Sequence, residues 1–320
     1  MGERVMAKQV VTAFAPASVG NVGPGFDVFG LALKGLGDKV TARRVSGSGV
    51  NILSIEGDDG KLSRDPSENT AGLAAAKTLK LCRDEGDSFG VEIILHKGLP
   101  LNSGLGSSGA SAAAAARAVS KLSDVVLSDQ QLLEVCVEAE AGVAGYHADN
   151  VAPSLLGGFI IIESYHPIST VRLTPPMDIP IGLVKPQIDI STRKARELVP
   201  ELVTINSTIN NLSKAASMVA HLMNADLESF GTAIRDVIVE PARAALVPGF
   251  MKAKHNLLEA GALGCSLSGS GPTLFFVASK HEELDALSQV AIKAFEDSNI
   301  QADFIASGLE TAGSIEVVDD

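Results

Sequence analysis

A glycine-rich loop that leads directly into an alanine-rich segment restricts the fold of this chain more than any other feature. Residues 100–111 read PLNSGLGSSGAS, and residues 112–119 read AAAAARAV, which is the composition of a strong helix. Glycines let the backbone come close to a ligand, while the free N–H groups and the dipole at a helix N-terminus favour negative charge. The pattern therefore predicts an anion site, with phosphate as the expected ligand.

Two common nucleotide-binding patterns do not fit this loop. Gly104, Gly106 and Gly109 have the spacing of the dinucleotide-binding fingerprint, which requires a second strand after the helix. Residues 128–145 instead repeat their apolar side chains at helical spacing, so no βαβ unit closes there. The lysine of the Walker pattern is missing as well, and Ser107 and Ser108 take its place. Their hydroxyls could touch a phosphate, ligate Mg²⁺ or cap a surface helix.

Charge and cysteine content narrow the class of protein. The formal net charge of −12 argues against binding of nucleic acid or of an anionic membrane, so a phosphate site has to be built locally. Cys82, Cys136 and Cys265 lie far apart in mostly apolar surroundings, which is typical of buried thiols in a reducing compartment. The sequence contains no apolar run long enough to span a bilayer. We therefore expect a globular cytoplasmic protein.

The order of expected strands and helices favours an α+β fold with two domains. In the first half we expect strands at 9–14, 39–44, 51–56, 91–96 and 158–163, and helices at 68–83, 112–119 and 128–145. In the second half we expect strands at 179–185, 273–278, 302–305 and 314–318, with helices within 191–260 and at 284–295. Pro167, Pro175 and Pro176 interrupt the chain between the halves. We therefore place the domains at 8–166 and 167–320.

Two polar clusters in the first half could contribute to a site. Residues 15–27 (APASVGNVGPGFD) follow a strand and contain Asn21 and Asp27, which could hold a small polar substrate or form an ordinary turn. Glu140 lies near the end of the helix that precedes His147, and a helical carboxylate that faces the serines would complete a Mg²⁺ site with nucleotide oxygens. Taken alone, a carboxylate such as Glu140 is more often a solvated helix acid, and His147 could equally be a hydrogen-bonded structural histidine.

A second glycine-serine loop and two arginines complete the candidates. Residues 266–272 (SLSGSGP) precede a strand, and if this loop faces the first one the two can enclose a triphosphate; otherwise it is a tight turn. Arg196 and Arg243 each lie near an expected helix start, and a planar guanidinium suits a substrate carboxylate. A surface ion pair is the commoner role of a single arginine.

Taken together and in this order, the motifs resemble those of the GHMP small-molecule kinases over nearly the whole chain. GLGSS at 104–108 is the signature of that family. NVGPGFDVFG at 21–30, HADNVAP at 147–153, STRKAR at 191–196 and VEPAR at 239–243 are similar to the branch that phosphorylates L-homoserine. The resemblance implies a two-domain GHMP kinase fold, in which an N-terminal domain like ribosomal protein S5 domain 2 precedes a ferredoxin-like domain. It also implies a homodimer.

The same resemblance implies ATP as co-substrate, Mg²⁺ as cofactor and a role for each matching residue. The ATP-phosphate loop would consist of Pro100, Leu101, Asn102, Ser103, Gly104, Leu105, Gly106, Ser107, Ser108, Gly109 and Ala110. Lys97 would contact a phosphate, and Asn69 would lie near the adenine. Ser108 and Glu140 would hold Mg²⁺. L-Homoserine would be bound by Asn21, Asp27, His147, Asn150, Arg196 and Arg243, and Thr192 would lie where the phosphoryl group passes.

The expected activity is transfer of the γ-phosphoryl group of ATP to the side-chain hydroxyl of L-homoserine, on the route to threonine. A kinase for another small alcohol is the alternative within the family, and a non-catalytic sensor that binds ATP and a metabolite is the alternative outside it. The interval from Glu140 to His147 is a residue shorter than the resemblance leads us to expect, so Glu138 stays a second candidate metal ligand, as Ser107 does beside Ser108.

The identity of a catalytic base is the remaining question for the sequence. Many GHMP kinases place an aspartate beside the attacking hydroxyl, whereas the matching residue here is Asn150. An amide cannot usefully accept a proton, and a loose phosphoryl-transfer transition state does not require a strong base. We therefore expect Asn150, with Thr192 and Lys97, to act by positioning and charge. Asp27 and Asp149 are the rival carboxylates.

Overall fold

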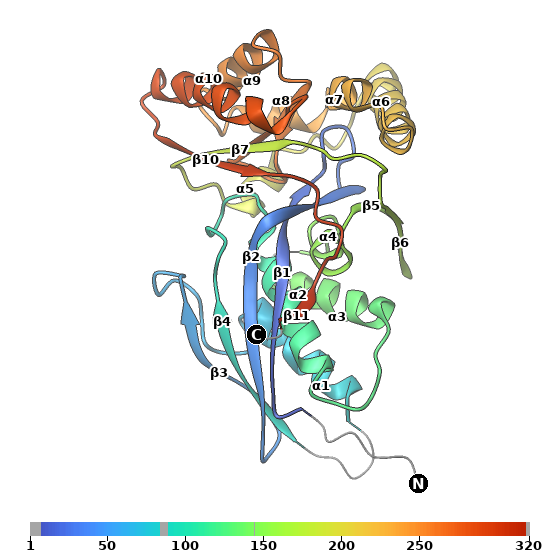
Figure 1. Ribbon diagram of the computed structural model, residues 1–320, viewed down its shortest axis with the longest axis vertical. Helices are drawn as coiled ribbons and strands as arrows, with labels where there is room; N and C mark the ends of the chain where they lie inside the picture. Colours follow the sequence, from blue (N-terminus) through green and yellow to red (C-terminus); the bar gives the residue numbers. More distant parts are fainter. Residues whose placement is uncertain (1–7, 84–88, 144, 318–320) are drawn as a thin grey trace.

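The computed structural model describes residues 8–83, 89–143 and 145–317, which form two sheets with helices packed on them (Figure 1). The first sheet contains β1 (Val10–Gly20), β2 (Phe29–Val45), β3 (Gly49–Glu56), β4 (Gly90–His96), β5 (Phe159–Tyr165), β6 (Ile168–Leu173) and β11 (Ile315–Val317). Its order is β11-β1-β2-β4-β3, and β5 pairs with both β2 and β6. Among the described strands of this sheet, only β3 and β4 pair in parallel.

The alanine-rich helix lies at the centre of the first half. The helices here are α1 (Thr70–Leu81), α2 (Ser107–Ser120), α3 (Asp129–Ala141) and α4 (Val151–Leu156). α2 packs on β1 and β2 and is also in contact with α1, α3 and α4. Its side chains are therefore buried almost all round, from Gly109 to Ser120 with Arg117 as the exception. Alanine fits this position because larger side chains would separate the closely packed neighbours.

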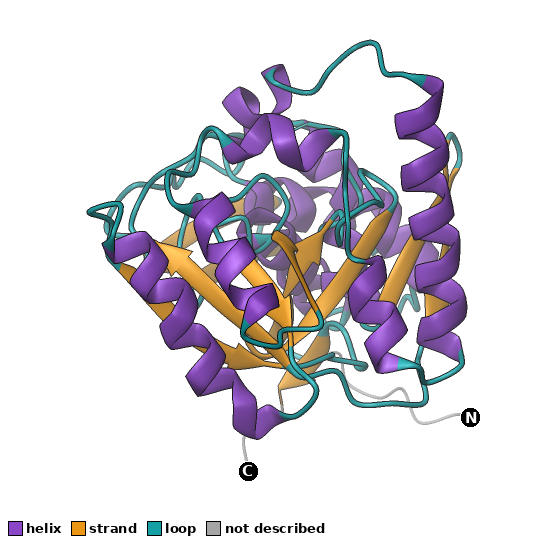
Figure 2. Cartoon of the chain, turned by 90° about the horizontal axis from the view of Figure 1, so that it is seen from above, coloured by secondary structure: helices purple, strands orange, loops and turns teal. Residues whose placement is uncertain are grey.

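The second sheet has the order β10-β7-β9-β8, and all its described pairs are antiparallel. Its strands are β7 (Ile181–Pro186), β8 (Gly264–Leu267), β9 (Leu274–Val277) and β10 (Ala302–Ser307). Figure 2 shows helices above strands when the chain is seen from above. The helices of this half are α5 (Thr192–Glu197), α6 (Ile205–Met223), α7 (Leu227–Ala233), α8 (Val239–Ala244), α9 (Phe250–Glu259) and α10 (Leu284–Glu296). Of these, α7, α8, α9 and α10 are in contact with strands of the second sheet.

The predicted α+β class is confirmed, and every expected strand and helix overlaps an observed one. Two strands depart from the expectation. β6 lies within the proline-bearing stretch interpreted as a junction, and β8 immediately precedes the second glycine-serine loop. The division into domains at 166/167 stays a prediction, although β6 and β11 both belong to the first sheet. Within the described part of the chain, none of the helices has the length and apolar character of a membrane span.

Candidate active site

A cavity of about 870 Å³ lies between the two halves of the chain and collects most of the residues singled out above. This volume suits a nucleotide together with a small second molecule. The predicted residues in its lining are Asn21, Asp27, Asn69, Lys97, Leu101, Asn102, Ser103, Gly104, Gly106, Ser107, Ser108, Glu140, His147, Asn150, Thr192, Arg196 and Arg243. Pro100, Leu105, Gly109 and Ala110 belong to the same loop and helix but not to this lining.

The glycine loop gives α2 an open N-terminus. α2 begins at Ser107, and its N-cap residue is Gly106, which has a φ of 67° and provides no side-chain cap. The interpretation of the serines as N-caps of a surface helix is therefore wrong. Without a side-chain cap, the N–H groups of the first turn remain available to an anion in the cavity.

The second glycine-serine loop packs directly on the first. The Ser268 hydroxyl donates to the carbonyl oxygen of Gly104 at 2.7 Å, and the N–H of Thr273 donates to the carbonyl of Ser103 at 3.2 Å. A Cβ atom on Gly104 would lie 2.4 Å from the Ser268 carbonyl oxygen, so only glycine permits this contact. The second loop therefore supports the first from the side of β8 and β9. Only Gly269 and Ser270 of this loop line the cavity.

Lys97 forms a buried ion pair that sequence reasoning missed. Its ammonium contacts the carboxylate of Asp38 and donates to the Ser107 carbonyl at 3.1 Å and to the Ser111 hydroxyl at 2.8 Å. Burial lowers the pKa of Lys97, and the adjacent Asp38 opposes this effect. All three N–H groups of the ammonium thus have a partner within the protein.

Asp38 connects both ends of the glycine loop. Besides Lys97, it accepts hydrogen bonds from the backbone N–H groups of the two residues that follow Lys97, at 3.0 and 3.2 Å, and from the Ser111 hydroxyl at 2.7 Å. Its side chain is fully buried. No periodicity or motif marks Asp38 in the sequence, because its partners lie about 60 residues away in the chain.

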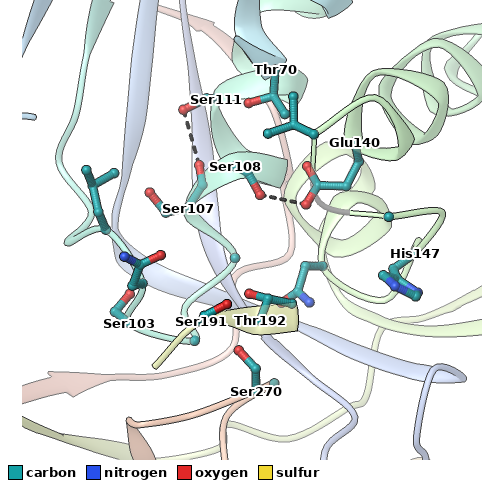
Figure 3. Close-up of a pocket in the computed structure, with 18 of the residues that line it drawn as sticks. Thr70, Ser103, Ser107, Ser108, Ser111, Glu140, His147, Ser191, Thr192 and Ser270 are labelled. Atoms are coloured by element: carbon teal, nitrogen blue, oxygen red, sulfur yellow. Dashed lines mark hydrogen bonds between the residues drawn. The ribbon is translucent and has the colours of Figure 1, made fainter. Parts of the chain in front are cut away.

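Ser108 and Glu140, the two residues that the resemblance implies as metal ligands, lie in direct contact (Figure 3). The Ser108 hydroxyl donates to Oε1 of Glu140 at 2.6 Å. The other carboxylate oxygen, Oε2, and the Ser107 hydroxyl are buried without a hydrogen-bond partner. Burial raises the pKa of Glu140 to about 7, although the Ser108 hydrogen bond and the charge of Lys97 oppose this.

Glu138, the second candidate metal ligand, lies elsewhere. Its carboxylate pairs with Lys77 at 2.5 Å, and 56% of its side chain is exposed. It does not line the cavity. Among the described residues, no group of three or more His, Cys, Asp and Glu side chains is arranged to hold a metal ion. Any metal here would therefore depend on hydroxyl and ligand oxygens in addition to Glu140.

Another part of the cavity lining carries an ion pair between Asp27 and Arg196. Two guanidinium nitrogens of Arg196 donate to the two carboxylate oxygens at 2.7 and 2.8 Å. Nη2 of Arg196 also lies 2.9 Å from Nδ1 of His147, whose pKa is lowered by burial and by this positive charge. Asp27 has a φ of 57°, and its carbonyl accepts a hydrogen bond from the Tyr165 hydroxyl at 2.7 Å.

Arg243 and Asn21 share one carbonyl oxygen. Nη1 of Arg243 donates to the Gly269 carbonyl at 2.9 Å, and the Asn21 amide donates to the same oxygen at 3.0 Å. Nε of Arg243 donates to the Ala195 carbonyl at 3.1 Å. The expectation that both arginines lie near a helix start is wrong, since Arg196 and Arg243 each lie in the last turn of a short helix.

Asn150 lines the cavity and contacts both Ser18 and Asp149. The hydroxyl of buried Ser18 donates a hydrogen bond to Oδ1 of Asn150 at 3.1 Å. Asp149 is 3% exposed, and burial together with the negative charge of Asp27 raises its pKa to about 7. Thr192 is the first residue of α5 and lines the same cavity.

Asn69 has its own local role as the N-cap of α1. Its side-chain oxygen accepts from the N–H of Ala71 at 3.0 Å, and its amide donates to the Ser63 carbonyl at 3.0 Å. Lys61 and Leu62, which the sequence did not single out, line the cavity beside it. That Asn69 lies near the adenine of ATP stays a prediction.

Comparison with known proteins gives a consistent result over most of the chain. The family model "GHMP kinases N terminal domain" matches residues 72–158, and "GHMP kinases C terminal" matches residues 218–297. Homoserine kinase of Chlorobaculum tepidum is 38% identical over 96% of this chain and 98% of its own. Homoserine kinase of Arabidopsis thaliana is 44% identical over 89% of this chain and 78% of its own.

Solved structures agree with these relatives. The crystal structure of homoserine kinase from Cytophaga hutchinsonii has a TM-score of 0.92 and 37% identity, and the match covers 99% of this chain and 100% of that one. L. major mevalonate kinase, solved with R-mevalonate, has a TM-score of 0.69 at 15% identity and supports the fold alone.

Proposed function

The chain belongs to the homoserine kinases of the GHMP kinase family, and from this premise we infer that it transfers the γ-phosphoryl group of ATP to the side-chain hydroxyl of L-homoserine. The bond between the β,γ-bridging oxygen and the γ-phosphorus breaks, a bond between the homoserine oxygen and the γ-phosphorus forms, and the hydroxyl proton is released to solvent. The products are ADP and O-phospho-L-homoserine, an intermediate of threonine biosynthesis. The observation that carries this proposal is the single cavity that joins an uncapped helix N-terminus to an Asp27–Arg196 ion pair.

The phosphate end of the cavity supplies N–H groups for ATP. We propose that the loop from Pro100 to Ala110 binds the triphosphate, because the first turn of α2 is open and lies beside the predicted metal ligands. Lys97 would contribute positive charge beneath this turn. A direct contact between Lys97 and a phosphate requires the ammonium to give up one of its three present partners.

Membership of a kinase family implies Mg²⁺ with ATP, and the residues present fit that ion. Glu140 Oε2 and the Ser107 hydroxyl are buried oxygens without partners, and Mg²⁺ prefers a few protein oxygens together with those of phosphates. We propose that Glu140 and Ser108, which are already in contact at 2.6 Å, hold the ion, with the unpartnered Ser107 hydroxyl as the alternative to that of Ser108. When bound, Mg²⁺ neutralises charge on the phosphates.

The homoserine end of the cavity offers both charges that an amino acid requires. We propose that Arg196 and Arg243 bind the α-carboxylate and that Asp27 binds the α-ammonium, while Asn21 and His147 hold these groups in place. Binding would then replace the Asp27–Arg196 ion pair by a contact of Asp27 with the ammonium and a contact of Arg196 with the carboxylate of the same amino acid. Asn150 and Thr192 would position the hydroxyl for in-line transfer, which supplies much of the acceleration in such reactions.

An ADP-release assay with a panel of small alcohols and amino alcohols tests the function. L-Homoserine should give the highest kcat/KM. A better substrate without a carboxylate would indicate a kinase for another alcohol. Tight ATP binding without ADP release from any member of the panel would indicate the non-catalytic sensor.

We further propose that two copies associate through an exposed apolar surface formed by the start of α6 and the residues before it. Leu202, Ile205, Ile209 and Leu212 are 91, 71, 57 and 67% exposed. Residues 202–213 include no charged side chain, so two copies of a chain with net charge −12 can meet there without like-charge repulsion. Sedimentation velocity should show a dimer that Ile209→Asp converts to a monomer. A monomeric unmodified chain would contradict the proposal.

We also propose a cytoplasmic location and no nucleic-acid partner. The three thiols are free and buried, and burial raises the pKa of Cys82 to about 11. Such thiols stay unreacted in a reducing compartment. The net charge of −12 opposes contact with a phosphate backbone. Cell fractionation and a gel-shift assay test the two statements.

A further inference from the structure

A single aromatic ring lies against both guanidinium groups of the cavity. The central guanidinium carbon of Arg196 lies 4.7 Å from the centre of the Phe26 ring, and that of Arg243 lies 5.1 Å from it. Both distances are within the range of cation–π attraction. Such contacts occur roughly once per 70–80 residues. The convergence of two on one ring, at the site where a carboxylate is expected, therefore points to a role for Phe26.

The two arginines repel each other, so something has to hold them together. The pKa of Arg243 is lowered by burial and by the positive charge of Arg196. Arg243 is fixed by two backbone carbonyls, whereas Arg196 depends on Asp27 and His147. If the ammonium of a substrate engages Asp27, Arg196 loses part of this support. The ring of Phe26 would remain in place.

An aromatic ring suits this task because it attracts a guanidinium without occupying the N–H groups that the guanidinium donates. The N–H groups of a guanidinium lie in its plane, whereas a cation–π contact engages its charge through the face of the ring. Phe26 can therefore attract both cations and leave their in-plane N–H groups for a carboxylate. A carboxylate or amide side chain at the same position would compete with the substrate carboxylate for those groups.

The loop that carries Phe26 is fixed on both sides. The N–H of Asp27 donates to the Asn21 side chain at 3.1 Å, and the carbonyl of Asp27 accepts from Tyr165. On the other side, a Cβ on Gly25 would lie 2.2 Å from the ring of Phe29, so the backbone there packs closely against that ring. The ring of Phe26 is thus positioned before any ligand arrives.

We propose that Phe26 is a positioning residue that holds the Arg196 and Arg243 guanidiniums together for the substrate carboxylate. This rests on the proposed function, since it assumes that the two arginines bind the α-carboxylate of L-homoserine. It gives Phe26, in the loop between β1 and β2, a part in selecting substrates that carry a carboxylate.

Two variants separate the effect of the aromatic ring from the effect of side-chain volume. Phe26→Leu keeps an apolar side chain but removes the ring, and Phe26→Tyr keeps the ring. We expect Phe26→Leu to raise the KM for L-homoserine by roughly five- to thirtyfold, with little change in kcat or in the KM for ATP. Phe26→Tyr should stay close to the unmodified chain. Thermal melts and the KM for ATP report on folding of both variants.

L-Homoserine amide, which lacks the carboxylate, makes the test specific. Phe26→Leu should lower kcat/KM for L-homoserine much more than for the amide. An equal loss for both compounds, or no loss for L-homoserine, would overturn the proposal and leave the proposed function intact. If the unmodified chain fails to phosphorylate L-homoserine at all, the proposed function falls and this inference falls with it.

Discussion

Replacement of Glu140 by glutamine should make the ligand-free protein more stable relative to the unmodified chain as the pH rises, and it should weaken the Mg²⁺-dependent activity. In the folded protein, burial raises the pKa of this carboxyl from its ordinary value of 4.5 to about 7. Between these two pH values the folded state holds a proton that the unfolded state has lost. The free energy of unfolding therefore falls as the pH rises through this window, and the penalty is complete above about pH 7.

The size of the effect follows from the two pKa values. From 4.5 to about 7 is a difference of about 2.5, which corresponds to on the order of 3 kcal/mol. Glutamine carries no charge, but its amide N–H groups can lack a partner at a cost of about 1–3 kcal/mol. The absolute change at one pH is therefore less informative than its pH dependence. Relative to the unmodified chain, Glu140→Gln should gain on the order of 3 kcal/mol between pH 4.5 and pH 8.

Chemical denaturation in EDTA, without nucleotide, measures this difference. Glu138→Gln is the matched control, because Glu138 is exposed and paired with Lys77 outside the cavity. The control should show no comparable change with pH. In the ADP-release assay, Glu140→Gln should be impaired and partly restored by higher Mg²⁺, while Glu138→Gln should be unaffected. A constant stability difference between Glu140→Gln and the unmodified chain from pH 4.5 to pH 8 would refute the reasoning.

Further predictions concern the other parts of the cavity. Gly106→Ala should weaken ATP binding about tenfold, since a Cβ there would lie 2.1 Å from the Ser18 hydroxyl and left-handed backbone costs about 1–2 kcal/mol; calorimetry that finds unchanged affinity would contradict this. Arg196→Ala or Arg243→Ala should each lower kcat/KM for L-homoserine roughly tenfold to a hundredfold, mainly through KM, with an unchanged KM for ATP in steady-state assays. Asp149→Asn should lower saturated kcat less than roughly a hundredfold; a loss beyond about a thousandfold, with disappearance of the low-pH limb of the rate profile, would identify Asp149 as the base.

Local elements of the fold could be predicted because their signals lie close together in the sequence. The glycine loop and α2 follow from residues next to each other, and α1 begins with an Asn69 N-cap. β6 could not be recognised, because prolines before and after it read as a break in the chain. β8 is four residues long and buried on both faces, so it lacks the alternation that marks a half-exposed strand.

The candidate site was predictable as a set of residues but not as a set of contacts. The resemblance picked out Lys97 and Arg196, whereas Asp38 and Phe26 became apparent only in the structure. Asp38 meets Lys97 because β2 and the segment after β4 lie side by side, and Phe26 meets two arginines from the other half of the chain. Contacts of this kind depend on the register of strands and on the packing of the two halves, which no local pattern records.

The pairing of β11 with β1 has a consequence for how the protein is made. Thr12 and Phe14 of β1 pair with Val317 and Ile315 of β11. The outer edge of β1 is therefore completed by a strand that lies about 300 residues later in the chain. A ribosome exposes that edge early and supplies its partner only after residue 315 has been added. Nascent chains and fragments that end sooner would present unpaired N–H and C=O groups, which recruit strands of other molecules. Attempts to express the first half alone should therefore give aggregates unless residues 315–317 are joined to it.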